Sequence, residues 1–372
     1  NEKDMLNAFI KFVFDTGPDI ITGWFSNAFD IPYLINRMLG TGLEPGNMSP
    51  LKQVYIRNDG EPIIRGIALM DLLDVYKKFT PNVEESYSLD FIAKKTIGQG
   101  KLGNSSNVNW QWRNNLDELI KYNATDTQLV VGINHKRKLL EFVDEIRKMC
   151  WCQYEDVLSA SRITDQYILK MFHNKIIFPT KAHNKPYEYE GAYVESWAKG
   201  VYNNVVCFDM ISLYPSLLHT FNLSPETLIE GDRPDLKSVC INGTYIRNDM
   251  KGFLVQVVDT LFGERIKYKK LMQQEVIGSE KYNLYYGRQY ALKVLLNSIY
   301  GQTAYVNSRI YSPKIAETVT FLGRSIIRWS KKRVEDLGFQ VLYADTDSLF
   351  FTGNRDITVD EIENACKKLN ES

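Results

Sequence analysis

Two strand-like segments that carry aspartates at their ends constrain the fold of this chain more than any other feature. The stretch NNVVCFDM ends its apolar run at Asp209, and FQVLYADTDSLFFTG carries Asp345 and Asp347 at its centre. Between them lie two helical blocks, at about residues 260–280 and 284–302, followed by a third helical stretch, AETVTFLGRSIIRWSKKRVEDLG. The periodicities predict strand-bearing parts that share one sheet, with the helical pair inserted between them.

The segment around Asp345 and Asp347 predicts a tight hairpin with an acidic tip. Side chains alternate along an extended strand, so the two carboxylates are expected on the same face. Taken alone, Asp-Thr-Asp is better explained as a solvated turn, and Asp209 alone as a cap of the helix that Pro215 can open. Together, carboxylates from two neighbouring strands can hold a pair of Mg²⁺ ions ~3.5–4 Å apart and promote phosphoryl transfer.

The two helical blocks supply the cations that such chemistry needs. On the first block, Arg265 and Lys269 are four residues apart and share a face. On the second, Lys293, Asn297 and Tyr300 also share one face. A basic helix face alone is usually only solvated. The mixture of lysine, asparagine and tyrosine instead favours contact with phosphates and a base pair.

Charge and composition place this basic region inside a neutral chain. The 45 Lys and Arg residues balance 45 Asp and Glu residues, so the total charge neither supports nor excludes a nucleic-acid partner. Residues 259–314 hold nine basic and four acidic residues, a local net charge of +5. The length of 372 residues predicts two or three domains at ~150 residues each.

Cysteine usage and hydropathy bear on the compartment. The one close cysteine pair, Cys150 and Cys152, has nothing nearby to complete a zinc site, so reduced thiols of an intracellular protein are expected. No apolar run reaches the ~18 residues needed to span a membrane. No signal peptide is visible.

The first part of the chain, to about Cys150, mixes strand-like and helical patterns. PDIITGW is extended, and IPYLINRML has helical spacing. The stretch LDELIKYNATDTQLVVGINHKRKLLEFVDEI predicts one long amphipathic helix. Such mixing favours an α/β unit.

With these motifs in view, the chain resembles the family B DNA polymerases. DMISLYPS (209–216) matches the first palm motif DxxSLYPS, and KVLLNSIYG (293–301) matches the fingers motif KxxxNSxYG. YADTDS (343–348) matches the second palm motif YGDTDS, with Ala344 in place of the usual glycine. ERIKYKK fits the RxxxKK element, and YEGAYV fits the YxGG/A linker element. NLSPETLIEG and the YADTDS variant lean toward a phage enzyme.

The resemblance extends upstream to the exonuclease motifs of the family. GWFSNAFDIPYL resembles the second motif, GxNxxxFDxPYL, and YNATDTQLV resembles the third, YxxxD. The implied exonuclease metal ligands are Asp30 and Asp126, with Tyr122 beside Asp126 on one helix face. The family's first motif, DxE, is expected upstream of residue 1, and Phe25 stands where the family has asparagine. The resemblance therefore implies an exonuclease that is inactive in this fragment.

The implied fold is an α/β and α+β multidomain protein. An N-terminally truncated RNase H-like 3′–5′ exonuclease domain, a connecting segment, the first part of the palm, the helical fingers and the second part of the palm are expected at 1–150, 151–205, 206–257, 258–305 and 306–372. The thumb that grips the duplex is expected beyond residue 372.

The implied reaction is template-directed DNA synthesis by two-metal nucleotidyl transfer from a dNTP to a primer 3′-OH. In this resemblance Asp209 and Asp347 bridge two Mg²⁺ ions, for which Mn²⁺ can substitute, Asp345 is a conditional ligand, and Lys293 assists catalysis. Tyr214 is the gate that excludes a 2′-hydroxyl. The implied nucleotide-binding residues are Ser212, Leu213, Tyr214, Arg265, Lys269, Asn297 and Tyr300.

The implied partners are primer-template DNA, dNTPs and, for the full-length protein, a sliding clamp, in the host cytoplasm if the enzyme comes from a phage. Two alternatives stay open. One is a non-catalytic DNA-binding scaffold that retains the polymerase fold, and the other is a reverse transcriptase or RNA polymerase. Retention of the palm carboxylates and the fingers cations argues against the scaffold.

Overall fold

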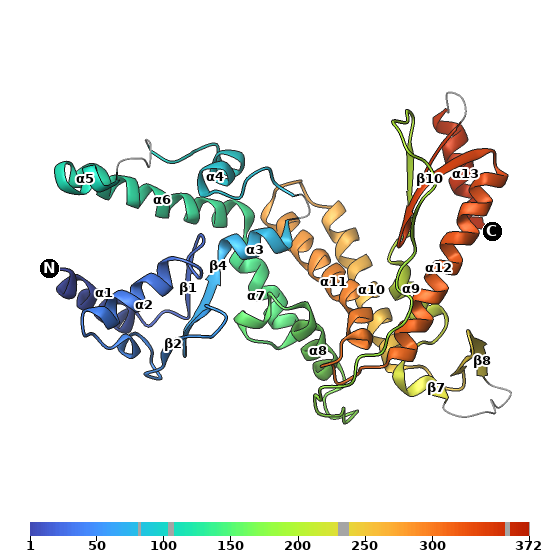
Figure 1. Ribbon diagram of the computed structural model, residues 1–372, viewed down its shortest axis with the longest axis horizontal. Helices are drawn as coiled ribbons and strands as arrows, with labels where there is room; N and C mark the ends of the chain where they lie inside the picture. Colours follow the sequence, from blue (N-terminus) through green and yellow to red (C-terminus); the bar gives the residue numbers. More distant parts are fainter. Residues whose placement is uncertain (81–82, 103–107, 230–237, 354–357, 372) are drawn as a thin grey trace. The chain divides into compact units, whose positions relative to one another are not determined.

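The computed structural model describes residues 1–80, 83–102, 108–229, 238–353 and 358–371. The chain divides into two compact units, Asn1–Ile163 and Thr164–Ser372. Both units combine helices with small sheets (Figure 1). Mixed α/β and α+β organisation is therefore confirmed.

The first unit sets two small sheets among helices. Its strands are β1 (Ile20–Gly23), paired in parallel with β4 (Ala68–Asp71), and β2 (Val54–Ile56), paired antiparallel with β3 (Pro62–Ile64). Its helices are α1 (Glu2–Thr16), α2 (Asp30–Gly40), α3 (Leu72–Phe79), α4 (Leu89–Ile97), α5 (Val108–Asn114), α6 (Leu116–Arg137) and α7 (Leu139–Cys150). A further helix, α8 (Ala160–Met171), runs across the boundary between the units.

The core of the first unit follows from helical periodicity. Leu6, Ile10 and Val13 recur every three or four residues along α1, so one face of the helix is apolar and buried. This face joins Ile31 and Ile35 of α2 in one hydrophobic cluster. Burial of each such side chain contributes about 1.5–3 kcal/mol relative to exposure.

The prediction of one long helix over the third exonuclease motif is wrong, because the structure has two helices there. The helix ends at Arg137, and a second helix begins at Leu139, because Lys138 between them adopts a left-handed conformation with φ 56°. Asn134 stabilises the break from both sides. Its carbonyl accepts from the Lys138 amide, and its side chain accepts from the Leu140 amide at 3.0 Å. Apolar periodicity continues across such a break and does not reveal it.

The second unit is built on a four-stranded antiparallel sheet in the order β5-β10-β11-β6. Its strands are β5 (Val194–Ser196), β10 (Phe339–Asp345), β11 (Ser348–Gly353) and β6 (Val206–Asp209). The long helix α12 (Pro313–Asp336) packs against it, with Ile327 and Val334 meeting Ala344, Leu349 and Phe351 in a buried cluster. The expectation that segments on both sides of the helical pair share one sheet is confirmed.

The helical pair consists of α10 (Phe253–Gln273) and α11 (Glu280–Ala304), which pack along each other (Figure 1). Both were expected, and α10 begins about seven residues earlier than its apolar pattern suggested. The remaining elements of this unit are α9 (Leu213–Thr220), the small sheet of β7 (Leu228–Ile229), β9 (Thr244–Arg247) and β8 (Ser238–Ile241), and α13 (Val359–Glu371).

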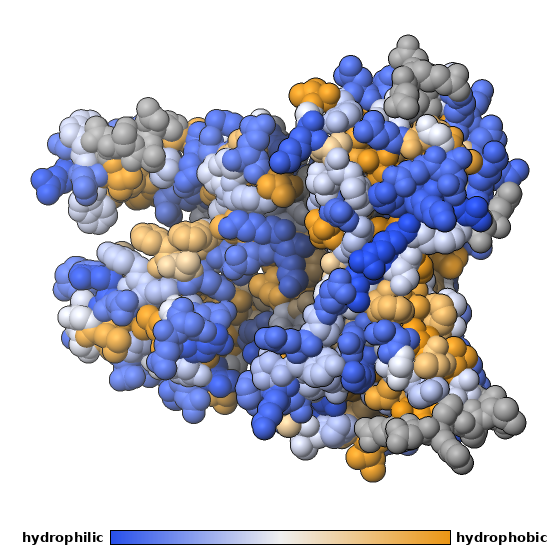
Figure 2. Space-filling view, turned by 45° about the vertical axis from the view of Figure 1, so that its right-hand side comes forward, coloured by the Kyte–Doolittle hydropathy of each residue, from blue (hydrophilic) through white to orange (hydrophobic). Residues whose placement is uncertain are grey.

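Two properties of the surface and composition complete the description. Within the described ranges, every helix is too short or too polar to cross a lipid bilayer. On the face drawn in Figure 2, hydrophilic residues predominate and hydrophobic ones lie in separate areas among them. None of the five cysteines forms a disulfide bond, and Cys150 and Cys152 are buried.

Candidate active site

The sheet of the second unit brings Asp209 and Asp347 together. β6 ends at Asp209, whose register partner on β11 is Ser348, the residue after Asp347. The amide of Met210 donates to the carbonyl of Asp347 at 2.9 Å, which continues the ladder past the strand end. Two residues 138 positions apart in sequence therefore lie on adjacent strands at the same end of the sheet.

A tight turn between β10 and β11 sets the position of Asp347. Thr346 has φ 56°, and its amide donates to the carbonyl of Tyr193 at 2.8 Å. The hairpin with an acidic tip is confirmed. The expectation that strand alternation governs Asp345 and Asp347 is wrong, because the chain is not extended between them.

Local side-chain hydrogen bonds hold the carboxylate of Asp345. Its carboxylate accepts from the Thr346 hydroxyl at 2.9 Å and from the Tyr343 hydroxyl at 3.2 Å. Two donors thus hold Asp345 beside the pair formed by Asp209 and Asp347. These two hydrogen bonds engage both oxygens of the Asp345 carboxylate.

The electrostatics of this strand end favour a bound cation. Burial raises the pKa of the Asp347 carboxyl, and the negative charges of Asp209 and then Asp345 raise it further. The pKa of the Cys207 thiol is also raised, first by burial and then by Asp209 and Asp347. Carboxylates that repel each other in this way are a suitable donor set for Mg²⁺, which uses one or two carboxylates and takes its other ligands from water and substrate phosphates.

The described residues do not form a closed metal site. Among the residues that the structure describes, no three His, Cys, Asp or Glu side chains surround a common point. The Asp209 and Asp347 pair offers two carboxylates, a donor set that suits an ion whose remaining ligands come from a substrate.

A cluster of tyrosines connects α9 and α11 near these carboxylates. The rings of Tyr214 and Tyr300 are 4.6 Å apart, and the hydroxyls of Tyr300 and Tyr189 are 3.1 Å apart. The pKa of Tyr214 is raised by burial and, in second place, by the charge of Asp347. Close packing also needs Gly323 on α12, because a Cβ there would lie 3.1 Å from Cε1 of Tyr214.

The start of α9 follows directly from the carboxylate strand. Ser212 has φ 53° and precedes the first helical residue, Leu213, without capping the helix through its side chain. The proposal that Asp209 caps this helix fails, because Asp209 is the last residue of β6 and Ser212 is the N-cap. The first backbone N–H groups of a helix have no partner within it and suit an anion.

The exposed face of α11 carries the residues expected on it. Lys293 and Asn297 are exposed, and Tyr300 is half-buried against Tyr214. On α10, Lys269 is exposed and Arg265 is half-buried. The buried Nε of Arg265 has no hydrogen-bond partner in the described part of the chain, and burial lowers the pKa of this group. An unpaired guanidinium N–H next to exposed lysine fits an anionic ligand.

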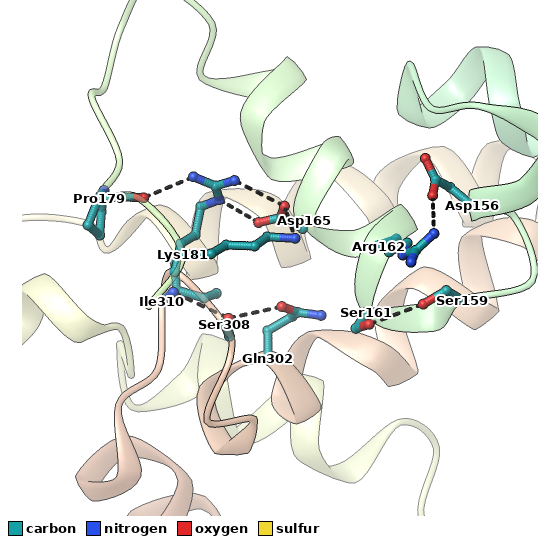
Figure 3. A network of polar contacts seen from close by, with 11 residues as sticks. Asp156, Ser159, Ser161, Arg162, Asp165, Pro179, Lys181, Gln302, Ser308 and Ile310 are labelled. Atoms are coloured by element: carbon teal, nitrogen blue, oxygen red, sulfur yellow. Dashed lines mark hydrogen bonds and ion pairs between the residues drawn. The ribbon is translucent and has the colours of Figure 1, made fainter. Parts of the chain in front are cut away.

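The loop after α11 is fixed by a buried ion cluster (Figure 3). Arg309 donates to both oxygens of Asp165, at 2.6 and 3.2 Å, and Lys181 approaches the same carboxylate at 2.9 Å. Arg309 also donates to the carbonyl of Pro179 at 2.9 Å. Because Asp165 is only 3% exposed, this cluster ties the end of the helical pair to α8.

The first unit places Asp30 beside a buried carboxylate that the motif comparison did not single out. Asp71, at the end of β4, accepts the amides of Phe25 and Asn27 at 2.9 and 3.1 Å and caps α3. Burial and, less strongly, the charge of Asp71 raise the pKa of Asp30. The signal for Asp71 was present in the sequence, because the apolar run GIALMD ends in aspartate as NNVVCFD does.

Phe25 stands in a strained position of the same turn. It has φ 66° and is 54% exposed, although asparagine tolerates this backbone conformation better than phenylalanine does. The asparagine of this turn is Asn27, whose side-chain oxygen is buried without a partner in the described residues.

Asp126 and Tyr122 lie together on α6, as their spacing predicted. Lys101 bridges them, with its Nζ 2.6 Å from the Asp126 carboxylate and 3.3 Å from the Tyr122 hydroxyl. Lys101 was missed at the sequence level because no local pattern links it to Tyr122, 21 residues later. Asp30 has Asp71 as its charged neighbour and Asp126 has Lys101, so the described contacts do not join Asp30 to Asp126.

Comparison with known proteins identifies the class to which this fold and site belong. The family model described as DNA polymerase family B matches residues 155–372, which is more than half of the chain. The model of the DNA polymerase family B exonuclease domain matches residues 1–92. The chain therefore belongs to the family B DNA polymerases.

Individual relatives agree with this assignment. DNA polymerase 1 of Pyrococcus abyssi is 29% identical over 95% of this chain and 47% of the relative. The DNA-directed DNA polymerase of Escherichia phage RB69 is 26% identical over 95% of this chain and 49% of the relative. The structure of the family B DNA polymerase from the hyperthermophilic archaeon Pyrobaculum calidifontis matches with a TM-score of 0.77 at 27% identity, covering 98% of this chain and 49% of that one.

The chain spans about half the length of the curated relatives it matches. The resemblance drawn from the motifs is confirmed, with an exonuclease part followed by palm and fingers. Archaeal and phage polymerases both occur among the relatives, so phage origin stays a prediction.

Proposed function

We propose that the full-length protein is a template-directed DNA polymerase that transfers a nucleotide from a dNTP to a primer 3′-OH. The observation that carries this proposal is the meeting of Asp209 and Asp347 at one end of a sheet, next to Tyr214 and the cationic helical pair. In this proposal the sheet of the second unit is the palm (206–257 and 306–372), and α10 and α11 form the fingers (258–305).

Each residue of the site has a distinct task in the proposed reaction. Asp209 and Asp347 would hold two Mg²⁺ ions, or Mn²⁺ in their place, with Asp345 as a conditional ligand. When bound, such ions favour in-line displacement by stabilising the attacking and leaving oxygens. The chain itself binds the triphosphate through the α9 amides of Ser212 and Leu213.

The helical pair completes the nucleotide site. Arg265, Lys269 and Lys293 neutralise the triphosphate, and the charge of Lys293 acts on the phosphates during transfer. Asn297 and Tyr300 line the pocket of the nascent base pair. Tyr214 packs beneath the sugar and excludes a 2′-hydroxyl. Primer-template DNA and dNTPs are the proposed substrates, and a sliding clamp is a proposed partner of the full-length protein.

The first unit is proposed as a 3′–5′ exonuclease domain (1–150) joined through residues 151–205, with Asp30 and Asp126 as metal ligands and Tyr122 beside them. The family resemblance implies that two-metal hydrolysis in this domain also uses the carboxylates of the DxE motif, in addition to these two. The domain is therefore proposed to be inactive in the chain as it stands.

Primer extension with the full-length protein tests the polymerase assignment. Asp347→Ala and Asp209→Ala should each lower the rate of primer extension by about a thousandfold or more. Loss of charge stabilisation of this kind raises the activation free energy by several kcal/mol. Asp360→Ala, which removes an exposed aspartate of α13, is the matched control and should extend as wild type. Extension within a few-fold of wild type by either palm variant would refute the proposal and leave the DNA-binding scaffold as the better reading.

The fingers cation is tested separately by single-turnover kinetics. Lys293→Ala should raise the nucleotide concentration needed for half-maximal rate and lower the maximal rate, because a point charge on the phosphates is lost. Lys332→Ala, an exposed lysine on α12, is the control. Unchanged values of both parameters in Lys293→Ala would show that this helix face is only solvated surface.

A further inference from the structure

The helix α10, which carries two of the proposed phosphate-binding cations, begins against a short segment that follows α9. This segment, residues 222–227, is called the anchor segment below. Its side chains accept hydrogen bonds from backbone amides at the start of α10, which lie 27 to 30 residues further along the chain. A helix is usually capped by a side chain at its own N-terminus. Capping from a distant segment instead fixes the position of the helix relative to that segment.

Asn222 and Glu226 accept the amides at the very start of α10. The amide of Gly252, the N-cap residue, donates to Oδ1 of Asn222 at 2.9 Å, and the amide of Phe253 donates to Oε1 of Glu226. The first amides of a helix have no partner within it, and a negative charge beside them is favourable because of the helix dipole. Glu226 therefore supplies both an acceptor and a charge at the base of α10.

The anchor segment is held together by its own hydrogen bonds. Ser224 accepts the amide of Leu254 at 3.3 Å, and its hydroxyl donates to Oε2 of Glu226 at 2.5 Å. The hydroxyl of Thr227 lies 2.6 Å from the carbonyl oxygen of Asn222 and 2.8 Å from that of Ser224. Ser224 and Thr227 are fully buried. A buried and hydrogen-bonded turn leaves little freedom to the side chains that hold α10.

The close approach between the anchor segment and α10 depends on a glycine. A Cβ on Gly252 would lie 2.5 Å from Cβ of Ser224 and 3.2 Å from Cγ2 of Thr227. Gly252 has φ −60°, which other residues also adopt, so steric contact and not backbone conformation restricts this position. At Gly263 on the same helix, a Cβ would meet no other part of the described chain within 4 Å. These two glycines form a matched pair for substitution.

A second contact holds the next turn of α10 to α9. Oδ1 of Asp259 on α10 lies 3.0 Å from Nε2 of His219, near the end of α9. The other oxygen of Asp259 accepts a hydrogen bond from Lys251, which precedes the helix. The first two turns of α10 are therefore held by α9, by the anchor segment and by the residue that leads into the helix.

The anchor segment lies between the two elements that are proposed to bind the triphosphate. On one side the chain leads back through α9 to the amides of Ser212 and Leu213. On the other side α10 carries Arg265 and Lys269, about 20 and 25 Å from Gly252 at 1.5 Å per residue. At that distance a tilt of about 5° at the base moves the cations by roughly 2 Å. Because misplacement by about 1 Å can cost a hundredfold in rate, the base of α10 determines how well the cations meet the phosphates.

We propose that Asn222 and Glu226 are positioning residues of nucleotide addition, which hold the base of α10 so that its cations face the triphosphate bound by α9. Neither side chain touches the nucleotide in this proposal. The inference rests on the proposed polymerase function and deepens it, because it names the residues that set the distance between the two triphosphate-binding elements.

Single-turnover primer extension by the full-length protein, at increasing dNTP concentrations, tests the proposal. Glu226→Ala removes the acceptor of the Phe253 amide and should raise the dNTP concentration for half-maximal rate about tenfold. The maximal rate should fall less than about threefold, because the carboxylates of the palm keep their places. Glu226→Gln keeps an acceptor and should lie within about threefold of wild type in both parameters, since only the charge at the helix start is lost.

The two glycines give an independent test on α10 itself. Gly252→Ala should also raise the dNTP concentration for half-maximal rate about tenfold, because the added methyl group pushes the helix away from Ser224. Gly263→Ala makes the same change on the same helix where space is open, and it should react as wild type.

Two further measurements separate positioning from loss of stability. Hydrogen exchange of the peptide that covers residues 252–260 should be faster in Glu226→Ala and Gly252→Ala than in wild type and Gly263→Ala. Thermal unfolding shows that each variant is folded at the assay temperature. If Glu226→Ala is not, Glu226→Asp takes its place with the same expectation, because it keeps the charge and withdraws the acceptor by one methylene group.

An unchanged dNTP concentration for half-maximal rate in the folded Glu226 variant or in Gly252→Ala would overturn the inference, and so would an equal rise in Gly263→Ala. Lower thermal stability with unchanged kinetics would assign the anchor segment a structural role only. Asp347→Ala judges the proposed function separately. If that variant extends primers as wild type does, the polymerase assignment fails. If it loses extension while Glu226→Ala reacts as wild type, only the inference fails.

Discussion

Asp347 is the residue at which burial and charge repulsion most clearly destabilise the ionised carboxyl in the folded state. Its carboxyl is partly buried and faces the charges of Asp209 and Asp345, so its pKa lies above the usual value. A raised carboxyl pKa means that the folded state holds its proton more tightly than the unfolded state does. Stability therefore falls as the pH rises from the unfolded pKa through the folded pKa, and the cost is fully present at neutral pH.

The first prediction follows from this repulsion. In metal-free solution at pH 7, Asp347→Asn should raise the free energy of unfolding of the second unit by less than about 1 kcal/mol, because the group is largely solvent-screened. The gain should shrink toward pH 4 as the wild-type carboxyl gains its proton. Mg²⁺ should stabilise wild type more than the variant. Chemical unfolding with and without Mg²⁺ measures this, and a destabilised variant at pH 7 would show that Asp347 has a structural partner instead.

Tyr214 yields the second prediction, which concerns sugar selectivity. The ring packs on Tyr300 and against Gly323, so it is held in one position. Tyr214→Ala should raise incorporation of ribonucleotides relative to deoxyribonucleotides by about tenfold or more, since rejection of one added hydroxyl is worth about 1–3 kcal/mol. Competition between the two nucleotides in primer extension gives the ratio. An unchanged ratio would remove the gate role and favour the RNA-polymerase alternative.

At the scale of elements, long-range polar contacts hold the helical pair to the rest of its unit. The carboxylate of Asp165 on α8 accepts hydrogen bonds from Arg309 and forms an ion pair with Lys181. Arg324 on α12 donates to the carbonyls of Glu190 and Gly191. The contacts of Arg309 and Arg324 join segments more than a hundred residues apart in sequence, whereas Lys181 lies 16 residues from Asp165. They fix the loop that follows α11 and the segment that precedes β5.

The third prediction compares two ion pairs drawn in Figure 3. Asp165→Asn should destabilise the protein by about 2–4 kcal/mol, because it leaves the guanidinium of Arg309 buried without a counter-charge. Asp156→Asn breaks the pair with Arg162, whose side chain is 56% exposed, and should cost less than about 1 kcal/mol. Chemical denaturation of both variants measures the difference. Equal losses of unfolding free energy in the two variants would mean that burial does not increase the contribution of Asp165 to stability.

At the scale of the whole molecule, the two units differ in how complete their proposed sites are. The second unit supplies adjacent carboxylates, a tyrosine cluster and a cationic helix face. In the described part of the first unit, Asp126 is neutralised by Lys101, and Asp30 has only Asp71 as its charged neighbour. A two-ion site needs carboxylates that face a common point, whereas the described contacts of Asp30 and Asp126 are with different neighbours.

The fourth prediction is that this chain, taken as it is, does not degrade a 3′-end-labelled single strand in Mg²⁺ or Mn²⁺. A version extended at its N-terminus by the DxE-bearing segment is the comparison. Degradation by the present chain that disappears in Asp126→Ala would contradict the prediction. Inactivity of the extended version as well would point to Phe25, whose strained turn lies beside Asp30, as the cause.

Local sequence patterns were sufficient for the family, the shared sheet of the second unit and the helical pair, while the residues of the proposed nucleotide site stay a prediction. They determine these features because periodicity reports backbone conformation, and because Asp209, Lys293 and Asp347 stand in short motifs with fixed spacing. The apolar run before Asp71 marks that residue in the sequence, but its contacts with the amides of Phe25 and Asn27 do not follow from the run. The contribution of Lys101, the break at Lys138 and the left-handed turn at Thr346 were visible only in the tertiary structure. Each depends on a backbone angle or on a partner distant in sequence, and such contacts form only when the chain is folded, so no local pattern encodes them.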